Sequence, residues 1–124
     1  MQHTLPGKRV LIVEDNPLLA HDIKDLMEDL GAVPIGPALD LQTGFALLDD
    51  NHPDAALLDV DLAGELVWPL AEALSARRVP FAFISADCTQ EYLPDRYRRM
   101  VCLEKPATTE ELVGVISELA AGAG

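Results

Sequence analysis

The sequence predicts an α/β fold: a doubly wound, five-stranded parallel sheet with helices on both faces. Five short apolar runs, each compatible with a buried strand, alternate along the chain with stretches of helical periodicity. Strands that alternate with helices at this spacing lie parallel and are joined by right-handed crossovers. The chain has 124 residues, 49% of them apolar, which fits a single domain over residues 1–124 with a core from about 8 to 121.

The apolar runs differ in ways that predict their places in the sheet. The run at 54–60 lacks polar alternation, which is typical of a central strand. Proline interrupts the run at 32–38, which favours an edge or a strand end because proline cannot donate to a ladder. The five predicted strands cover residues 8–13, 32–38, 54–60, 80–85 and 100–103.

Residues that begin and end helices separate these strands. Asn16 and the proline after it are typical of an N-cap and a first helical position, and Gly31 ends that helix. Asp40 can cap a second helix, and a third follows the central strand. Thr108 and Glu111 have the spacing of a capping box, so we expect the last helix to begin there.

The charge distribution excludes one class of partner. A net charge of -12 argues against direct binding of DNA or RNA, which usually needs a basic face. The segment 87–99 is polar with weak periodicity, and we expect only a short or irregular helix in it. It carries a cluster of cations, Arg96, Arg98 and Arg99, interpreted as a solvated helix face, with a partner-docking patch as the alternative.

Several other features have ordinary structural interpretations. Cys88 and Cys102 show no framework of short spacings, so we expect two reduced thiols at core or loop positions in a cytoplasmic chain. Trp68 is expected to pack in the core rather than to contact a ligand. No apolar run is long enough to span a membrane, and the first seven residues do not resemble a signal peptide.

Polar side chains of a particular kind follow four of the five predicted strands. The first strand is followed by Glu14 and Asp15, and the third ends in Asp59. The fourth ends in Ser85, and Lys105 follows the fifth. In an open α/β sheet these positions meet at one edge, where ligands bind.

This set of residue types indicates a particular chemistry. Three carboxylates brought close together repel one another and resist full ionisation, and a hard divalent cation such as Mg²⁺ resolves the repulsion. A hydroxyl and an ammonium beside them suit the oxygens of a phosphoryl group. The pattern therefore predicts a Mg²⁺-assisted phosphoryl site that works by positioning and charge neutralisation.

Each of these residues also has an ordinary structural explanation when taken alone. Asp15 can cap a helix, and Asp59 can occupy a turn at a strand end. Ser85 and Lys105 are common residue types at the start of loops. The combination at the strand ends carries the prediction.

Four segments together resemble a known family. The sequence is similar to the CheY-like receiver domains of response regulators, from Lys8 to about Ala121. This resemblance implies a flavodoxin-like sheet with strand order 2-1-3-4-5. The segments that carry it are Val-Leu-Ile-Val-Glu-Asp-Asn-Pro (10–17), Ala-Leu-Leu-Asp-Val-Asp-Leu (56–62), Phe-Ile-Ser-Ala (83–86) and Glu-Lys-Pro (104–106).

The resemblance implies a role for each residue at the strand ends. Asp59 is the expected phosphoacceptor, Ser85 is expected to hydrogen-bond the phosphoryl group, and Lys105 is expected to form an ion pair with it. A cis peptide bond is implied before Pro106. The implied Mg²⁺ ligands are Asp15 and Asp59 directly, Glu14 through water, and Asp61 through its backbone carbonyl.

The chain departs from the family pattern at the switch position. Family members usually carry tyrosine or phenylalanine three residues before the lysine, where this chain has Cys102. Together with the weak helix after the fourth strand and Pro-Phe-Ala-Phe at 80–83, this resembles the single-domain FAT GUY subgroup. The match is partial, because Ile84-Ser85-Ala86 stands where that subgroup has Ala-Thr-Gly.

The expected function is that of a phosphoacceptor in a two-component or phosphorelay system. A histidine kinase or histidine phosphotransfer protein would phosphorylate Asp59 with the help of Mg²⁺, and the signal would pass to a downstream protein. We expect no turnover enzyme, no nucleic-acid or membrane partner, and a monomer or weak homodimer in the cytoplasm.

Three alternatives belong to other classes. The first is a receiver-like interaction module that works without phosphorylation. The second is an enzyme, since Asp59-Val60-Asp61 superficially resembles the Asp-x-Asp of haloacid-dehalogenase-type phosphatases, although there the motif follows an early strand of a longer chain. The third is a flavodoxin-like flavin protein, which would need a hydroxyl-rich phosphate loop after the first strand; this chain lacks one.

Overall fold

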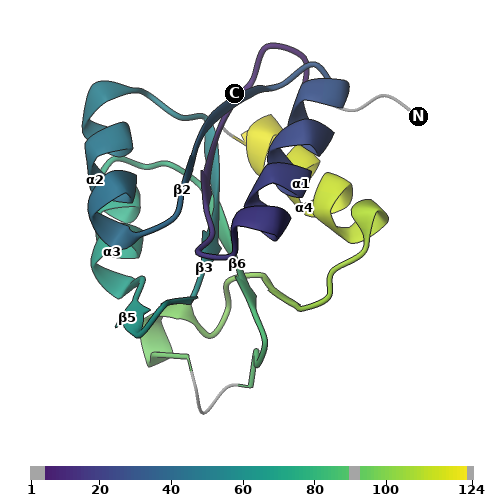
Figure 1. Cartoon of the computed structure of the whole chain (residues 1–124). Coiled ribbons are helices and arrows are strands. Elements are labelled where there is room, and N and C mark those ends of the chain that lie inside the picture. The colour runs from purple at the N-terminus through teal and green to yellow at the C-terminus, as the bar shows by residue number, and fades with distance from the viewer. Residues whose placement is uncertain (1–4, 90–92, 123–124) are drawn as a thin grey trace.

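The structure, a computed structural model, describes residues 5–89 and 93–122. Its main sheet has parallel strands in the spatial order β2-β1-β3-β6-β7 (Figure 1). Because β6 and β7 are the fourth and fifth strands of this sheet, the predicted order 2-1-3-4-5 is confirmed. The strands are β1 (Arg9–Val13), β2 (Val33–Ala38), β3 (Ala55–Asp59), β6 (Phe81–Ser85) and β7 (Cys102–Glu104).

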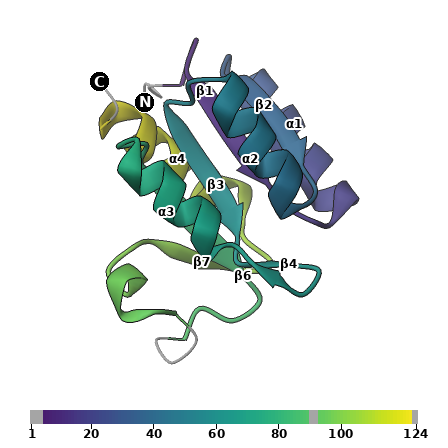
Figure 2. The ribbon, with the colours of Figure 1, turned by 90° about the vertical axis from the view of Figure 1, so that its left-hand side faces the viewer.

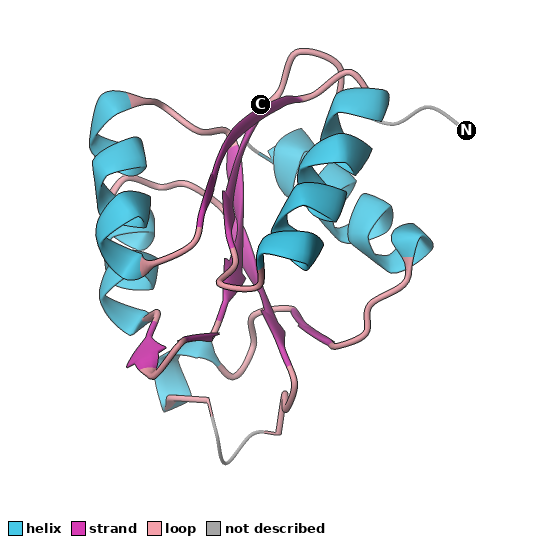
Figure 3. Cartoon of the chain, viewed as in Figure 1, coloured by secondary structure: helices cyan, strands magenta, loops and turns pink. Residues whose placement is uncertain are grey.

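Helices cover both faces of the sheet, as predicted, and Figure 3 shows the three layers. Successive residues of a strand point to opposite faces, so each inner strand contributes to two apolar cores. In β3, Leu58 lies in one core and Leu57 in the other. The helices are α2 (Leu41–Asp50) and α3 (Trp68–Ala76) on the Leu58 side, and α1 (Pro17–Asp29) and α4 (Thr109–Gly122) on the Leu57 side.

The residues predicted to begin helices form the expected caps. Two backbone N–H groups in the first turn of α1 donate to Oδ1 of Asn16 at 3.0 and 3.3 Å. The N–H of Thr43 donates to Asp40 at 2.7 Å at the start of α2. Thr108 and Glu111 exchange two hydrogen bonds of 2.9 and 3.1 Å, which completes the capping box before α4.

No helix in the described ranges has the length and apolar run that crossing a bilayer requires.

A small hairpin after β3 was not predicted. It pairs β4 (Asp61–Leu62) with β5 (Glu65–Leu66) in antiparallel register. Its two-residue turn places Ala63 at φ 54° and Gly64 at φ 96°, the left-handed backbone that such a tight turn requires. Each strand has only two residues, too short to leave a periodic signal in the sequence.

The segment between β6 and β7 carries only a short 3₁₀ helix, η1 (Asp95–Tyr97), as predicted for its described part. Residues 90–92 lie outside the described residues. The ring of Tyr97 is buried and stacks on Trp68 with centroids 5.5 Å apart, and it meets Phe83 edge to face at 5.4 Å. These contacts hold η1 near the start of α3, and Figure 2 shows this short helix below α3. They confirm Trp68 as a packing residue.

The arginines of this segment lie at the surface. Arg96, Arg98 and Arg99 are exposed. Arg96 pairs with Glu72 at 3.1 Å and Arg98 with Asp95 at 3.0 Å, both in exposed positions. Such pairs contribute little to stability, so the interpretation as a solvated face agrees with the structure.

The prediction of two reduced thiols is wrong. Cys88 and Cys102 form a disulfide, with their Cα atoms 5.9 Å apart. Cys102 lies opposite Phe83 in the β6–β7 pair, and the chain after β6 turns back so that the N–H of Cys88 donates to Glu104 at 3.4 Å. This return path brings together two cysteines whose sequence separation of 14 gave no pairing signal.

We predict that the core beneath α2 and α3 contributes strongly to the stability of the fold. Phe83 is 0% exposed, so Phe83→Ala should lower the free energy of unfolding by about 3–5 kcal/mol in chemical denaturation. Leu18 on α1 is 76% exposed, so the control Leu18→Ala should change it by less than about 0.5 kcal/mol. Equal losses for the two variants would contradict this assignment of the core.

Candidate metal centre at the carboxyl ends of the strands

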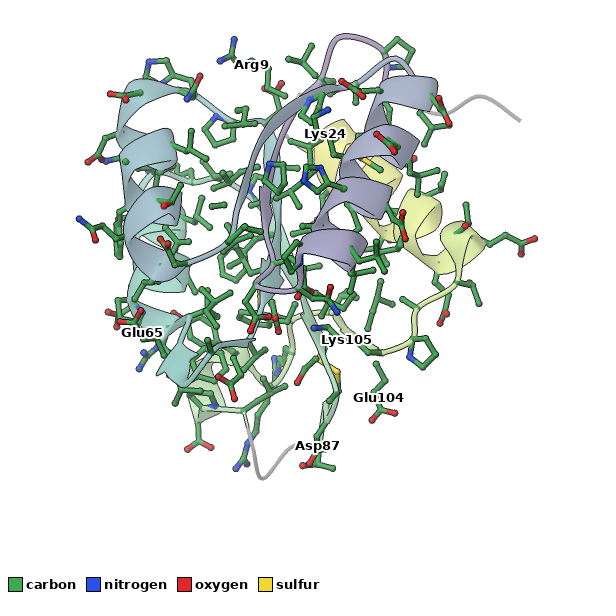
Figure 4. The ribbon with its side chains drawn as sticks, viewed as in Figure 1. Arg9, Lys24, Glu65, Asp87, Glu104 and Lys105 are labelled. Atoms are coloured by element: carbon green, nitrogen blue, oxygen red, sulfur yellow. A yellow bond between two sulfur atoms is a disulfide. The ribbon has the colours of Figure 1, made fainter. Side chains whose placement is uncertain are left out.

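The register of the sheet brings the predicted site residues to one edge. Val13 pairs with Leu58, so Glu14 and Asp15, which follow β1, come level with Asp59 at the end of β3. Ser85, the last residue of β6, pairs with Glu104, so the next residue along, Lys105, reaches the same edge. The convergence predicted from the strand ends is therefore present, and Figure 4 shows Lys105 at this edge.

The three carboxylates lie in direct proximity. Glu14, Asp15 and Asp59 each offer an oxygen within 4.8 Å of the others. Glu14 is 0% exposed and Asp59 only 3%, whereas Asp15 is partly exposed. At such separations in a partly desolvated setting, like charges repel strongly. The cluster needs positive charge to hold all three groups ionised.

Lys105 supplies one positive charge to the cluster. Its Nζ lies 2.9 Å from Oε1 of Glu14 and 3.2 Å from Oδ2 of Asp59. The contact with Asp59 is a hydrogen bond. The contact with Glu14 is an ion pair, but its geometry is not that of a hydrogen bond. The peptide bond between Lys105 and Pro106 is cis, as the resemblance implied.

Backbone N–H groups also point at the carboxylates. The N–H of Asn16 donates to Oε2 of Glu14 at 2.9 Å. The N–H of Ala63, in the turn of the β4–β5 hairpin, donates to Oδ2 of Asp15 at 3.0 Å. Sequence reasoning missed Ala63, because a backbone donor carries no residue-type signal and its place depends on the unpredicted hairpin.

Ser85 lies at the site, but its hydroxyl is engaged elsewhere. Its Oγ donates to the carbonyl of Asp87 at 3.1 Å and accepts from the N–H of Asp87 at 3.2 Å. The residue itself is 4% exposed. Ser85 therefore belongs to the lining of the site, while its hydroxyl is held by the loop that follows it.

The side chain of Asp61 supports the hairpin. Its Oδ1 accepts from the N–H of Gly64 at 2.8 Å, and its own N–H points at Oδ1 of Asp59 at 3.4 Å. The expected metal contact through its carbonyl stays a prediction. A cavity of about 390 Å³ opens in front of the carboxylates and is lined by Asp15, Asp59, Asp61, Ala63, Ser85, Ala86, Asp87 and Lys105.

The environment of Asp59 disfavours its ionised form. Burial is the largest cause, and together with the neighbouring Asp15 and Glu14 it raises the pKa of Asp59 from 3.8 to about 8. The charge of Lys105 acts in the opposite direction but does not outweigh these effects. Without further positive charge, Asp59 is therefore mostly protonated at neutral pH.

The two neighbouring groups shift toward their charged forms. Burial opposes ionisation of Asp15, yet hydrogen bonds with Asp59 and Glu14 bring the pKa of Asp15 below its ordinary value. Burial likewise opposes the charge of Lys105, yet its contacts with Glu14 and Asp59 raise the pKa of Lys105. Of the two aspartates, Asp15 is therefore the one that ionises first, and Asp59 the one that holds the proton.

The donor set fits a hard divalent cation. Three carboxylates share this edge with one ammonium, and all the donors are oxygens, the ligands that Mg²⁺ prefers. The cavity in front of them leaves room for the waters that Mg²⁺ usually keeps and for a phosphoryl group. Glu14, Asp15 and Asp59 are the described residues that could hold such an ion.

Comparison with known proteins identified several signalling and regulatory proteins that are similar to this chain. No family model matches the chain. The solved structure of SdrG from Sphingomonas melonis Fr1 is 36% identical, covers 91% of this chain and 96% of its own, and has a TM-score of 0.78. SdrG is also solved in its BeF₃-activated conformation, 34% identical over 93% of this chain and 98% of its own, with a TM-score of 0.76.

Two further relatives are a response-regulator domain and a regulatory protein. The response-regulator REC domain of PhyR from Erythrobacter litoralis is 27% identical, covers 92% of this chain and 90% of its own, and has a TM-score of 0.82. The transcriptional regulatory protein PdtaR of Mycobacterium tuberculosis is 28% identical over 88% of this chain. The chain spans 55% of the length of PdtaR.

We predict that Asp59 destabilises the metal-free fold as pH rises. In the folded protein the pKa of Asp59 is raised from 3.8 to about 8. The contribution of the protonated carboxyl to the free energy of unfolding is therefore complete below about pH 4 and is lost as pH rises through about 8. With a chelator present, Asp59→Asn should therefore raise the free energy of unfolding at about pH 9 by roughly 1–3 kcal/mol.

The measurement is chemical denaturation across this pH range. The matched control is Asp54→Asn, at the opposite end of β3, where Asp54 accepts from the N–H of Arg9 at 2.9 Å. It should not reproduce the pH-dependent gain. A gain for Asp59→Asn that does not grow with pH would contradict the account.

Proposed function

The chain belongs to the CheY-like receiver domains of response regulators, and on that premise we propose that Asp59 accepts a phosphoryl group from a phosphohistidine. The donor would be a histidine kinase or a histidine phosphotransfer protein. One observation carries the proposal: three carboxylates cluster at the strand ends, and two of them, Asp15 and Asp59, line an open cavity together with Lys105, which contacts Asp59.

The proposed step is a phosphoryl transfer between two side chains. A carboxylate oxygen of Asp59 forms a bond to phosphorus while the bond from phosphorus to the histidine nitrogen breaks. The electron pair of that bond stays with the imidazole, which takes a proton. When bound, Mg²⁺ would supply the charge that keeps Asp59 ionised and that neutralises the phosphoryl oxygens.

Lys105 and Ser85 are the proposed partners of the phosphoryl group. Nζ of Lys105 is already 3.2 Å from Oδ2 of Asp59, so its charge lies where the phosphoryl oxygens would gather. The hydroxyl of Ser85 has to leave Asp87 to reach them, because both of its hydrogen bonds are with that residue. Transfer would therefore be linked to a rearrangement of the loop after β6.

This loop is our candidate for the segment that passes the signal on. It leads to η1, whose Tyr97 is held by Trp68 and Phe83. A shift near Ser85 can thus reach an exposed surface that carries Arg96, Arg98 and Arg99. SdrG has been solved in a BeF₃-activated conformation, and BeF₃ is an anion of a size and charge similar to a phosphoryl group, which supports an activated state for a chain of this fold.

The phosphoacceptor hypothesis explains more of the residues at the site than the alternative functions do. An interaction module that works without phosphorylation has no use for buried Glu14 and Asp59 beside Lys105. In a phosphatase of the Asp-x-Asp type the second aspartate has to act at the reacting group, whereas Asp61, although it lines the cavity, has its Oδ1 held by the N–H of Gly64 in the hairpin. The relatives are signalling proteins rather than turnover enzymes.

The proposed partners are proteins. PdtaR is a transcriptional regulatory protein, but a net charge of -12 favours a protein target over nucleic acid for this chain itself. We further propose a monomer or weak homodimer that works in the cytoplasm without a membrane partner, and that loses the phosphoryl group by its own hydrolysis.

The test is the intact mass after incubation with acetyl phosphate. With Mg²⁺ the wild type should gain the mass of one phosphoryl group, and without Mg²⁺ the gain should be lost. Asp59→Asn should gain nothing. Asp54→Asn, which changes a carboxylate at the other end of the same strand, should behave like the wild type.

Two results would overturn the proposal. The first is a folded wild type that takes no phosphoryl group from acetyl phosphate or from a phosphorylated histidine kinase. The second is a gain that persists in Asp59→Asn, which would place the acceptor elsewhere. Circular dichroism of each variant separates loss of the acceptor from loss of the fold.

A further inference from the structure

The disulfide between Cys88 and Cys102 joins the two chain segments that supply the non-carboxylate groups of the site. Cys88 comes three residues after Ser85, and Cys102 comes three residues before Lys105. In the side-chain view of Figure 4 the bond between the two sulfurs lies close to Lys105 and Glu104. A covalent link at this place can constrain how the site rearranges.

The link fixes the loop that occupies Ser85. The hydroxyl of Ser85 exchanges two hydrogen bonds with the backbone of Asp87, the residue directly before Cys88. Cys88 is bonded to Cys102 and its N–H points at Glu104, so both of its connections run to β7. The disulfide of Cys88 therefore holds Asp87, the preceding residue, next to Ser85.

The disulfide lies at the margin of the apolar cores. Two buried cores on either side of the sheet hold the strands and helices together, and Cys88 belongs to neither, whereas the partly buried Cys102 packs against one of them. Domains with sufficient cores rarely need a disulfide, and where one occurs in a reducing environment it is usually catalytic or redox-sensing. Both cysteines are only half-buried, so a small reagent can reach them.

We propose that Cys88 and Cys102 are a reversible redox-modification site, oxidised by low-molecular-weight disulfides and reduced by thiols. The thiolate of one cysteine attacks the small disulfide, forms a mixed disulfide and releases one small thiol. The second thiolate attacks the protein sulfur of the mixed disulfide and releases the other small thiol. Two protein thiols are oxidised, one small disulfide is reduced, and the two protons go to the released thiolates.

The oxidised state restrains the loop after β6, and the reduced state releases it. Release lets Asp87 move away, so the hydroxyl of Ser85 is free to turn toward Asp59. The consequence for phosphoryl uptake rests on the function proposed above, whereas the redox pair and its effect on the loop do not. These two parts can be tested separately.

The first experiment counts thiols in the folded, full-length chain. The protein is equilibrated in mixtures of oxidised and reduced glutathione without denaturant, then alkylated and weighed. The expected result is a conversion between no label and two labels, which reverses when the mixture is reversed. A disulfide that resists excess glutathione in the folded protein, or a product that carries only glutathione adducts, would overturn the proposal.

The second experiment measures hydrogen exchange in both redox states without any phosphoryl donor. Reduction should speed exchange of backbone amides at 86–89 and 93–101 by at least about tenfold, because the cross-link no longer limits local opening. Amides of α2 should keep their rates. The double variant Cys88→Ser/Cys102→Ser should exchange like the reduced wild type. Equal exchange in both redox states would contradict the proposed restraint.

The third experiment compares phosphoryl uptake from acetyl phosphate in the two states. The reduced protein should take up the group several-fold faster than the oxidised protein, and the double serine variant should not respond to the redox state. Equal rates would refute the effect on the site. If neither state takes a phosphoryl group, the proposed function fails, and the first two experiments still decide on the redox pair.

Discussion

The confinement of three carboxylates and one ammonium at a single sheet edge is the interaction on which the rest of this structure depends. Glu14, Asp15 and Asp59 lie within 4.8 Å of one another, and Lys105 contacts two of them. Burial and like charge together leave Asp59 with a pKa raised to about 8. Such an acidic cluster is suited to bind a divalent cation, whose charge would offset the repulsion that raises the pKa of Asp59.

The fold provides the rigidity that holds this unfavourable arrangement. Parallel pairing of β1 with β3 fixes the acidic pair beside Asp59, and pairing of β6 with β7 fixes Ser85 beside the lysine. Apolar layers on both faces stabilise these strands, so the repulsion at the edge is offset elsewhere in the molecule. Residues 86–89, at the start of the loop after β6, belong to neither core. The site therefore combines carboxylates fixed by strand pairing with a hydroxyl that is held by the following loop.

The sequence predicted those parts of the molecule that depend on local chemistry or on strand ends. The caps at Asn16 and Asp40 are confirmed, because a cap follows from residue type at a helix start. The order of the strands, which the family resemblance implied, is confirmed as well. The hairpin that brings the N–H of Ala63 to Asp15 escaped prediction, since a backbone donor has no residue signature. The pairing of Cys88 with Cys102 escaped it as well, because it depends on the return path of a loop.

Calorimetric titration with Mg²⁺ at pH 7, repeated in two buffers of different ionisation enthalpy, tests the central claim most directly. The account predicts one bound ion and, because the pKa of Asp59 lies near 8, release of nearly one proton on binding. Asp59→Asn should release none, and Asp15→Asn should bind far more weakly. A wild type that binds no Mg²⁺, or an Asp15→Asn variant that binds it equally well with the same proton release, would contradict the claim that this cluster is a metal-dependent acceptor site.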